Sequence, residues 1–347
     1  MNQNWLFENA VTPIRYNLTH RAEDAEHLLQ NGEISVWLSR LAERSQANVI
    51  GDIHGSHDYR MENILGKCWI LGLSKNIPAF AENMSFIQSC LNNHIQTTPS
   101  AELSFGKLYR DCEKVLACFL PFLGYHADPA VLHIVRKRIE VLFGFTKQKR
   151  YDIYVDGSKI KGVKKAWQPY IIAPDLYADG HIALPDMHDF LLFAGMYPFL
   201  PLDDQNKIET IAAWLFGDGY NDVIRRYGYF YAPGGSYNTK AIIFKPHLLE
   251  FQDMSFDKGD LVSLLFTVFV LSHFKTAKES VWFSLAMAYL DHYKNEAGRY
   301  SFPSHMISEK PDSYGENKKS KLYNEILSTY WIERIHQNMT GKERNVK

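Results

Sequence analysis

Two aspartates lie three residues apart in the segment Asp186-Met187-His188-Asp189. Apolar spacing over 185–198 predicts a helix, which would place both carboxylates on one face. A carboxylate pair can hold Mg²⁺ or supply a catalytic acid. Asp186 and Asp189 are therefore the first candidates for catalysis, with Mg²⁺ as the one cofactor that the pair suggests. Alternatively, carboxylates in a first turn simply complement the helix dipole.

A second group of polar residues gathers in the loop before the helix predicted at 61–73. It contains His54, His57, Asp58, Tyr59 and Arg60. Such side chains can bind a polar group or transfer protons near neutral pH. Asp58 is the third candidate acid, and the other four are candidate ligand-binding residues. The alternative is a loop held together by its own hydrogen bonds. No residue is assigned to any other metal.

The same loop carries Val49-Ile50-Gly51-Asp52-Ile53-His54-Gly55, which resembles the first motif of calcineurin-like metallophosphoesterases. The resemblance implies that Asp52 and His54 bind one metal of a two-metal site. The segment 217–222 is out of step with the family's second motif by one residue and lacks its arginine. The family also needs many strands alternating with helices. Metallophosphoesterase activity is therefore the last of the functional alternatives.

Further ligand-binding candidates lie in the second half of the chain, and they are Tyr229, Tyr237, Arg299, Glu325 and Trp331. Aromatic side chains stabilise cations and stack on sugars, although they pack cores just as often. Polar residues on the apolar helix predicted at 320–338 must find partners. A cavity would supply them, and a structural network with Arg299 or Lys310 is the simpler alternative.

Helical periodicity predominates along the chain. The predicted helices are 22–30, 33–44, 61–73, 79–94, 107–123, 129–145, 185–198, 204–216, 258–273, 277–294 and 320–338. Asp128-Pro129 is typical of a helix start, and Asp203 is expected to cap the helix that follows it. Hairpins are predicted at 151–163, with Asp156-Gly157 at the turn, and at 228–244, with Gly234-Gly235 at the tip.

Composition excludes several classes of protein. The 347 residues carry a formal net charge of −1, which argues against binding nucleic acid or an anionic membrane. Hydrophobic residues make up 46% of the chain, enough for a sizeable core. Four cysteines without a CxxC pair indicate neither a disulfide framework nor a thiolate zinc site.

The apolar run Leu261–Leu271 is too short for a membrane span, so we expect a buried helix there. No signal peptide is recognised, and a cytoplasmic protein is expected.

Short apolar-aromatic-Leu segments recur at Val36-Trp37-Leu38, Ala213-Trp214-Leu215 and Ala288-Tyr289-Leu290. Together with 205–242 and 281–303, they resemble the terpenoid-cyclase and protein-prenyltransferase repeat superfamily, over about 35–303. The resemblance implies an (α/α) toroid of about six helical hairpins. The catalytic motifs of that superfamily are incomplete in this sequence. Pro201-Leu202-Asp203-Asp204 lacks the leading aspartate of DxDD, Asp186 and Asp189 only approximate DDxxD, and no Asp/Cys/His zinc site can be assembled.

We therefore predict an all-α protein, a single (α/α)6 toroid over 1–339 with small β-hairpin insertions and a polar tail at 340–347. Its predicted function is to bind or act on an isoprenoid-like hydrophobic ligand. A carbohydrate-processing hydrolase or lyase, and a non-catalytic toroid scaffold, remain as alternatives. The expected partner is a small hydrophobic or carbohydrate ligand, without nucleic acid and without integral membrane insertion. Neither the substrate nor the oligomeric state follows from the sequence.

Overall fold

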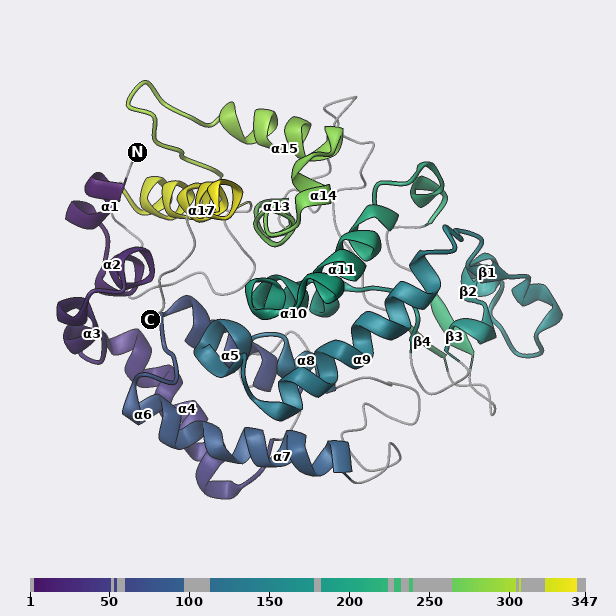
Figure 1. Ribbon diagram of the computed structural model, residues 1–347, viewed down its shortest axis with the longest axis horizontal. Coiled ribbons are helices and arrows are strands. Elements are labelled where there is room, and N and C mark those ends of the chain that lie inside the picture. Colours follow the sequence, from purple (N-terminus) through teal and green to yellow (C-terminus); the bar gives the residue numbers. More distant parts are fainter. Residues whose placement is uncertain are drawn as a thin grey trace.

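The computed structural model describes residues 3–50, 53–54, 60–96, 113–177, 182–223, 228–231, 237–239, 264–303, 306 and 322–341. This part of the chain is mostly helical, which confirms the all-α prediction (Figure 1). Its α-helices are α1 (Gln3–Asn9), α2 (Thr12–Thr19), α3 (Ala22–Leu28), α4 (Gly32–Ala47), α5 (Met61–Ile70), α6 (Pro78–Ala81), α7 (Ser85–Gln96), α8 (Glu113–Ala117), α9 (Pro129–Thr146), α10 (Met187–Met196), α11 (Leu202–Trp214), α13 (Leu264–Leu271), α14 (Lys275–Lys278), α15 (Val281–Asp291) and α17 (Tyr323–Thr340).

Helix α10 lies in the middle of the molecule, next to α8, α9 and α13 (Figure 1). Every residue from Asp189 to Met196 is buried. A helix that is apolar on all sides has no face to offer to water, so it must be enclosed by other elements. Helix α13 is buried in the same way except at Phe266, which confirms the buried helix expected within 261–271.

The first two helices were not predicted, because segments this short give little periodic signal. Asn17 of α2 is buried, and its side-chain amide donates to the carbonyl of Ile70 at 2.6 Å. This bond fixes the amino-terminal helices against the end of α5.

A small four-stranded sheet stands at one end of the molecule, in the order β1–β2–β3–β4. Strand β1 (Tyr154–Val155) pairs antiparallel with β2 (Ile171–Ile172), and β2 pairs parallel with β3 (Tyr229–Tyr231). The predicted hairpin at 151–163 is therefore wrong. Asp156 caps a 3-10 helix, Gly157–Lys159, through its bond to the amide of Ser158 at 3.0 Å, and β1 finds its partner further along the chain.

The second predicted hairpin is confirmed where the structure describes it. Strand β3 pairs antiparallel with β4 (Tyr237–Thr239). Its expected tip, Gly234-Gly235, lies outside the described residues.

The two predicted helix caps had different outcomes. Asp128 caps α9 as predicted, accepting from the amide of Ala130 at 2.8 Å. Asp203 does not cap α11, because the helix already begins at Leu202. Asp203 instead lies in the first turn and pairs with Lys207 at 2.9 Å.

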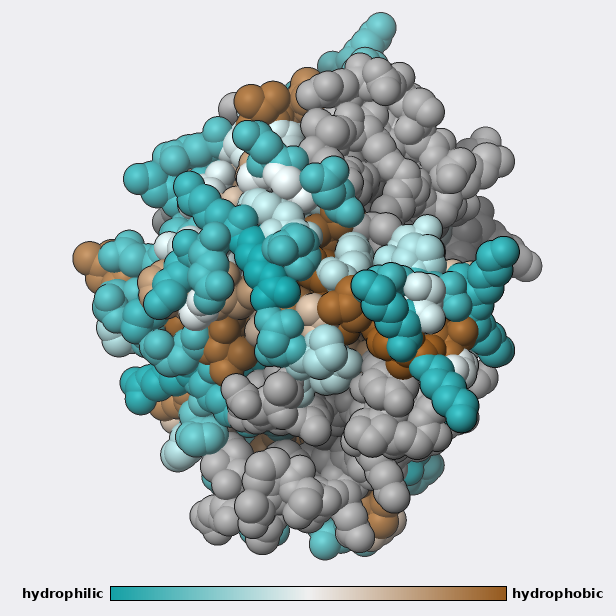
Figure 2. Space-filling model, turned by 90° about the vertical axis from the view of Figure 1, so that its right-hand side faces the viewer, coloured by the Kyte–Doolittle hydropathy of each residue, from teal (hydrophilic) through white to brown (hydrophobic). Residues whose placement is uncertain are grey.

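On the face that Figure 2 shows, hydrophilic side chains are interspersed with separate groups of hydrophobic ones. Within the described ranges, no helix combines the length and the apolar character that crossing a membrane requires.

Candidate metal centre

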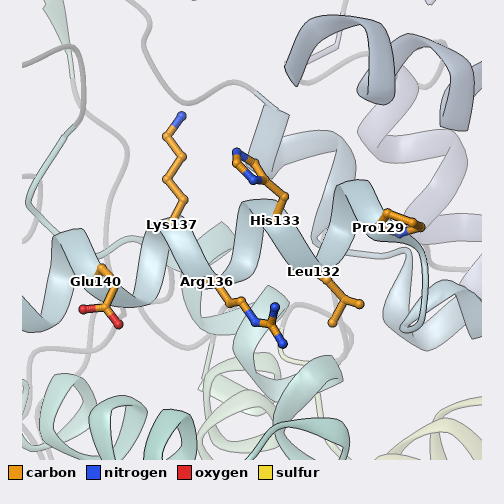
Figure 3. Close-up of a pocket in the computed structure, with 6 residues that line it drawn as sticks. All are labelled: Pro129, Leu132, His133, Arg136, Lys137 and Glu140. Atoms are coloured by element: carbon orange, nitrogen blue, oxygen red, sulfur yellow. The ribbon is translucent and has the colours of Figure 1, made fainter. Parts of the chain in front are cut away.

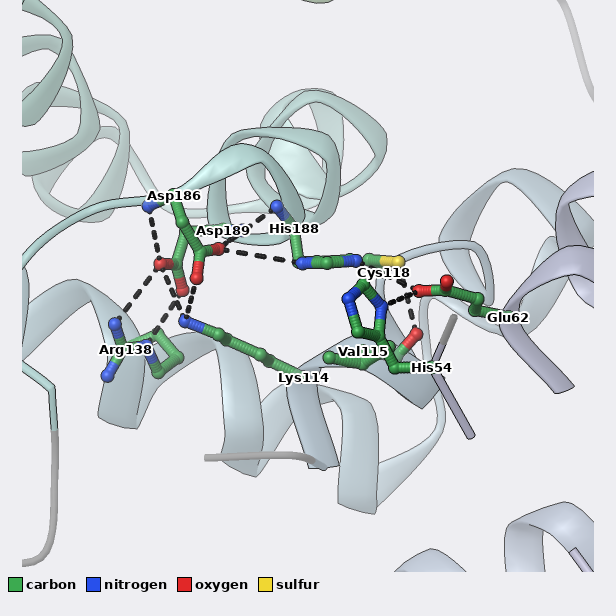
Figure 4. Close-up of polar contacts among 9 residues, drawn as sticks. All are labelled: His54, Glu62, Lys114, Val115, Cys118, Arg138, Asp186, His188 and Asp189. Carbon is green, nitrogen blue, oxygen red and sulfur yellow. Dashed lines mark hydrogen bonds and ion pairs between the residues drawn. The ribbon is translucent and has the colours of Figure 1, made fainter. Parts of the chain in front are cut away.

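Three side chains that could bind a metal converge between α5 and α10 (Figure 4). Glu62 Oε2 lies 2.7 Å from His54 Nδ1 and 3.1 Å from His188 Nε2. These three atoms all lie within 4.8 Å of one another. The two imidazole rings meet edge to face, with their centroids 5.4 Å apart. One carboxylate oxygen thus lies between two imidazole nitrogens.

Two helix starts position this cluster. Glu62 is the second residue of α5, and its amide donates to the carbonyl of Ile53 at 3.0 Å, which holds the neighbouring His54 close to the helix. His188 is the second residue of α10. The ligands therefore come from segments 126 residues apart in the chain.

The cluster combines a buried acid with two less buried bases. The side chains of Glu62 and His188 are 8% and 12% exposed, and that of His54 is 36% exposed. Burial by itself would raise the pKa of Glu62, but the hydrogen bonds and charges of His188 and His54 outweigh it and hold that pKa well below its ordinary value. Glu62 is therefore ionised, and His54 is the most exposed of the three side chains.

Asp186 and Asp189, the first candidates for catalysis, lie beside the cluster in a fully buried ion network. Asp186 is the N-cap of α10 and forms a capping box with Asp189. Asp189 accepts from Arg138 Nε at 2.8 Å and from Lys114 Nζ at 3.0 Å, and Asp186 Oδ2 lies 2.9 Å from the same Lys114 nitrogen. All four side chains are 0% exposed.

This network changes what the aspartate pair can do. Two cations already balance its two charges, which is the role that the suggested Mg²⁺ would have filled. Both carboxylates are also fully buried, as are the lysine and the arginine that pair with them. The Mg²⁺ site and the acid role stay predictions, and the geometry gives the pair a structural task.

Cys118 lies close to the same groups and donates to the carbonyl of Val115 at 3.3 Å. Burial raises the pKa of its thiol, and the carboxylates of Glu62 and Asp186 raise it further. A thiol that keeps its proton is a poor metal ligand. Among the described residues, the ligand set is the two histidines and Glu62.

The remaining candidate residues do not join this cluster. Arg299 and Glu325 approach to 3.8 Å, which supports the structural alternative, and Glu325 also accepts from Asn295 at 2.8 Å. Trp331 is buried against Phe269, with ring centroids 5.2 Å apart. It therefore packs in the core.

Tyr229 stacks on Trp167 in the sheet region, with ring centroids 4.6 Å apart. Arg60 occupies the N-cap position of α5, beside the cluster in sequence. Asp52, His57, Asp58, Tyr59, Lys310 and the side chain of Tyr237 lie outside the described residues.

A surface hollow of about 470 Å³ adjoins α9, lined by Pro129, Leu132, His133, Arg136, Lys137 and Glu140. In Figure 3 the side chains of Leu132 and Arg136 point away from those of His133 and Lys137. A binding site needs polar groups that converge on one point. The side chains of this hollow do not converge, so it is a weaker candidate for a functional site than the cluster of His54, Glu62 and His188.

The sequence analysis found His54 but missed its two partners. His188 lies inside a segment considered only for its aspartates, and Glu62 was not considered. Glu62 is the second residue of the helix predicted at 61–73 and His188 is the fourth of the helix predicted at 185–198, so the available signal was a polar residue near the start of each apolar helix. Nothing in the sequence showed that these two helix starts meet.

Comparison of the chain with protein-family models, curated proteins and solved structures gave no match.

Proposed function

We propose that this protein binds a divalent transition metal, preferably Zn²⁺, through His54, Glu62 and His188, and that the metal activates water for hydrolysis. The observation that carries the proposal is the position of Glu62 Oε2, within 3.1 Å of nitrogens from two histidines. Two histidines and one glutamate form a ligand set typical of catalytic zinc.

The distances fit a metal after a small movement. Tetrahedral zinc with bonds of about 2.1 Å separates its ligand atoms by about 3.4 Å. The two distances to Glu62 Oε2, 2.7 and 3.1 Å, are slightly shorter than this value. The two histidine nitrogens lie within 4.8 Å of each other. A small withdrawal of the carboxylate, with a movement of the partly exposed ring of His54 toward the metal, would bring all three ligands into place.

The ligand count favours catalysis over a structural role. Structural zinc is closed by four protein ligands, whereas catalytic zinc has three and keeps one position for water or substrate. The described residues supply three. A zinc ion held by His54, Glu62 and His188 would supply a bound water that is acidic enough to act as a nucleophile near neutral pH, for hydrolysis of a carboxylic or phosphoric ester. The proton that this water loses would pass to the leaving oxygen of the ester.

Zinc titration of the chelator-treated protein tests the site. We expect one Zn²⁺ per chain by calorimetry and by elemental analysis. His54→Ala and Glu62→Gln should weaken binding at least tenfold, because each removes one ligand. The matched control is His133→Ala, an exposed histidine on α9, which should leave the affinity unchanged.

Activity is measured separately on a nitrophenyl ester and on a nitrophenyl phosphodiester. Hydrolysis that is lost on chelation, restored by Zn²⁺ and absent from Glu62→Gln supports the proposal. Wild-type protein that takes up no zinc would reduce the cluster to a hydrogen-bonded group of polar side chains. Zinc uptake without hydrolysis of either substrate would contradict the catalytic part.

The toroid and the isoprenoid-like ligand implied by the superfamily resemblance also stay proposals. The support for them is the mostly helical architecture with the buried helices α10 and α13 in its interior. Native mass spectrometry of the purified protein would test the ligand, since a retained isoprenoid adds a defined mass. A carbohydrate in its place would favour the carbohydrate-processing alternative, and a protein without any bound molecule would favour the scaffold.

A further inference from the structure

The ring nitrogen of His188 that faces away from Glu62 is an unusual feature of the cluster. His188 Nδ1 is buried and has no hydrogen-bond partner among the described residues. Its nearest carboxylate oxygen is Asp186 Oδ1, at 3.8 Å. A buried polar atom without a partner is costly, so this arrangement calls for an explanation.

Binding of a metal by His188 would explain why its Nδ1 has no hydrogen-bond partner among the described residues. A histidine that binds metal through Nε2 carries its proton on Nδ1, and that N–H group is normally held by a carboxylate or a carbonyl. In the structure Nε2 makes the contact with Glu62, at 3.1 Å, and Nδ1 faces Asp186. With a metal on Nε2, the ring proton would lie on Nδ1.

We propose that Asp186 is the positioning residue for His188 in the zinc-bound protein, accepting a hydrogen bond from Nδ1–H. This inference rests on the metal site proposed above. The step requires Nδ1 and Oδ1 to close from 3.8 Å to about 2.9 Å. Zinc binding would thus pair an atom that is otherwise without a hydrogen bond.

Asp186 is well held for this task. Its Oδ1 already accepts from the amides of His188 and Asp189, at 3.1 and 3.2 Å, and its Oδ2 lies 2.9 Å from Lys114 Nζ. Lys114 is in turn bound to Asp189, which Arg138 clamps. The buried ion network therefore fixes the carboxylate that the zinc ligand needs, which connects the two clusters in one arrangement.

The decisive variant is Asp186→Asn. Asparagine still caps a helix and keeps the volume of the side chain, but it loses the charge that stabilises Nδ1–H. We expect zinc affinity to fall about 10- to 100-fold. Asp189→Asn, which loosens the same network without facing Nδ1, should lose markedly less affinity than Asp186→Asn. The matched control is Asp203→Asn, an exposed aspartate of α11 paired with Lys207, which should bind zinc as the wild type does.

A spectroscopic measurement on the wild type needs no variant to fold. In zinc-loaded protein labelled with ¹⁵N-histidine, His188 should show a metal-bound Nε2 and a protonated Nδ1 whose proton exchanges slowly with water. Comparison with His188→Ala assigns the signals. Coordination through Nδ1 would overturn the proposal.

The two proposals fail in different ways. Zinc binding by the wild type with unchanged affinity in Asp186→Asn overturns the role of Asp186 and leaves the metal site intact. An equal loss of affinity in Asp186→Asn and Asp189→Asn also overturns it, because general loosening of the network would then suffice. No zinc binding by the wild type overturns both.

Discussion

Asp189 shows how strongly a single side chain can depend on its surroundings. It is fully buried, and its two oxygens accept from Arg138, Lys114 and the amide of Asp186. Two cations and two anions enclosed together are tolerable because each charge is neutralised and hydrogen-bonded. The same carboxylate in an exposed helix would contribute almost nothing to stability.

Asp189→Asn should therefore destabilise the protein by about 3–5 kcal/mol, because it leaves two buried cations with only one anion. Asp203→Asn is the matched control, since Asp203 is 78% exposed and forms a surface pair with Lys207. That change should stay within about 0.5 kcal/mol. Urea unfolding followed by circular dichroism measures both, and similar losses in the two variants would contradict the structural role of the buried network.

At the scale of elements, Gly157 shows why the hairpin at 151–163 was predicted wrongly. Asp-Gly suggested a two-residue turn, where glycine supplies an unusual backbone angle. In the structure glycine is needed for a close approach. A Cβ atom at position 157 would lie 2.6 Å from the carbonyl oxygen and 2.7 Å from the Cα atom of Gln168. The chain packs backbone against backbone at this point.

Gly157→Ala should consequently destabilise the protein by about 1–3 kcal/mol, since the atoms that it meets are main-chain atoms that cannot rotate away. Gly144→Ala is the control, because a Cβ atom there meets nothing within 4 Å and the position lies in α9. Removing glycine from a helix should stabilise it by up to about 1 kcal/mol. Thermal unfolding should therefore shift in opposite directions, and a loss of stability in both would argue against the packing at Gly157.

For the whole molecule, the metal centre joins regions that are far apart in sequence. His54 lies in the segment before α5, Glu62 at the start of α5 and His188 at the start of α10. The three side chains meet only when these segments are packed, so the unfolded chain lacks the site. Zinc bound there would then stabilise the folded state as a whole.

At a zinc concentration about 100 times the dissociation constant, we expect a stabilisation of about 2.7 kcal/mol. The midpoint of thermal unfolding should rise by several degrees and return to its starting value when a chelator is added. His54→Ala should lower the stabilisation at the same zinc concentration to about 1.4 kcal/mol or less, because a loss of affinity of tenfold or more leaves zinc at no more than about 10 times the dissociation constant. An undiminished rise in His54→Ala would place the zinc elsewhere on the protein.

The sequence by itself determined the local structure. Periodicity predicted α4, α5, α9 and α10, and Asp128-Pro129 marked the start of α9, because helices and their caps depend on residues within a few positions of one another. It also brought attention to His54, Asp186 and Asp189. The tertiary structure decided what these residues do. Glu62 and His188 meet His54, and Lys114 and Arg138 neutralise the aspartates, only because α5, α8, α9 and α10 pack together. Apart from that between His54 and Glu62, which are 8 residues apart, these hydrogen bonds and ion pairs span 51 to 126 residues along the chain, and no local pattern encodes them.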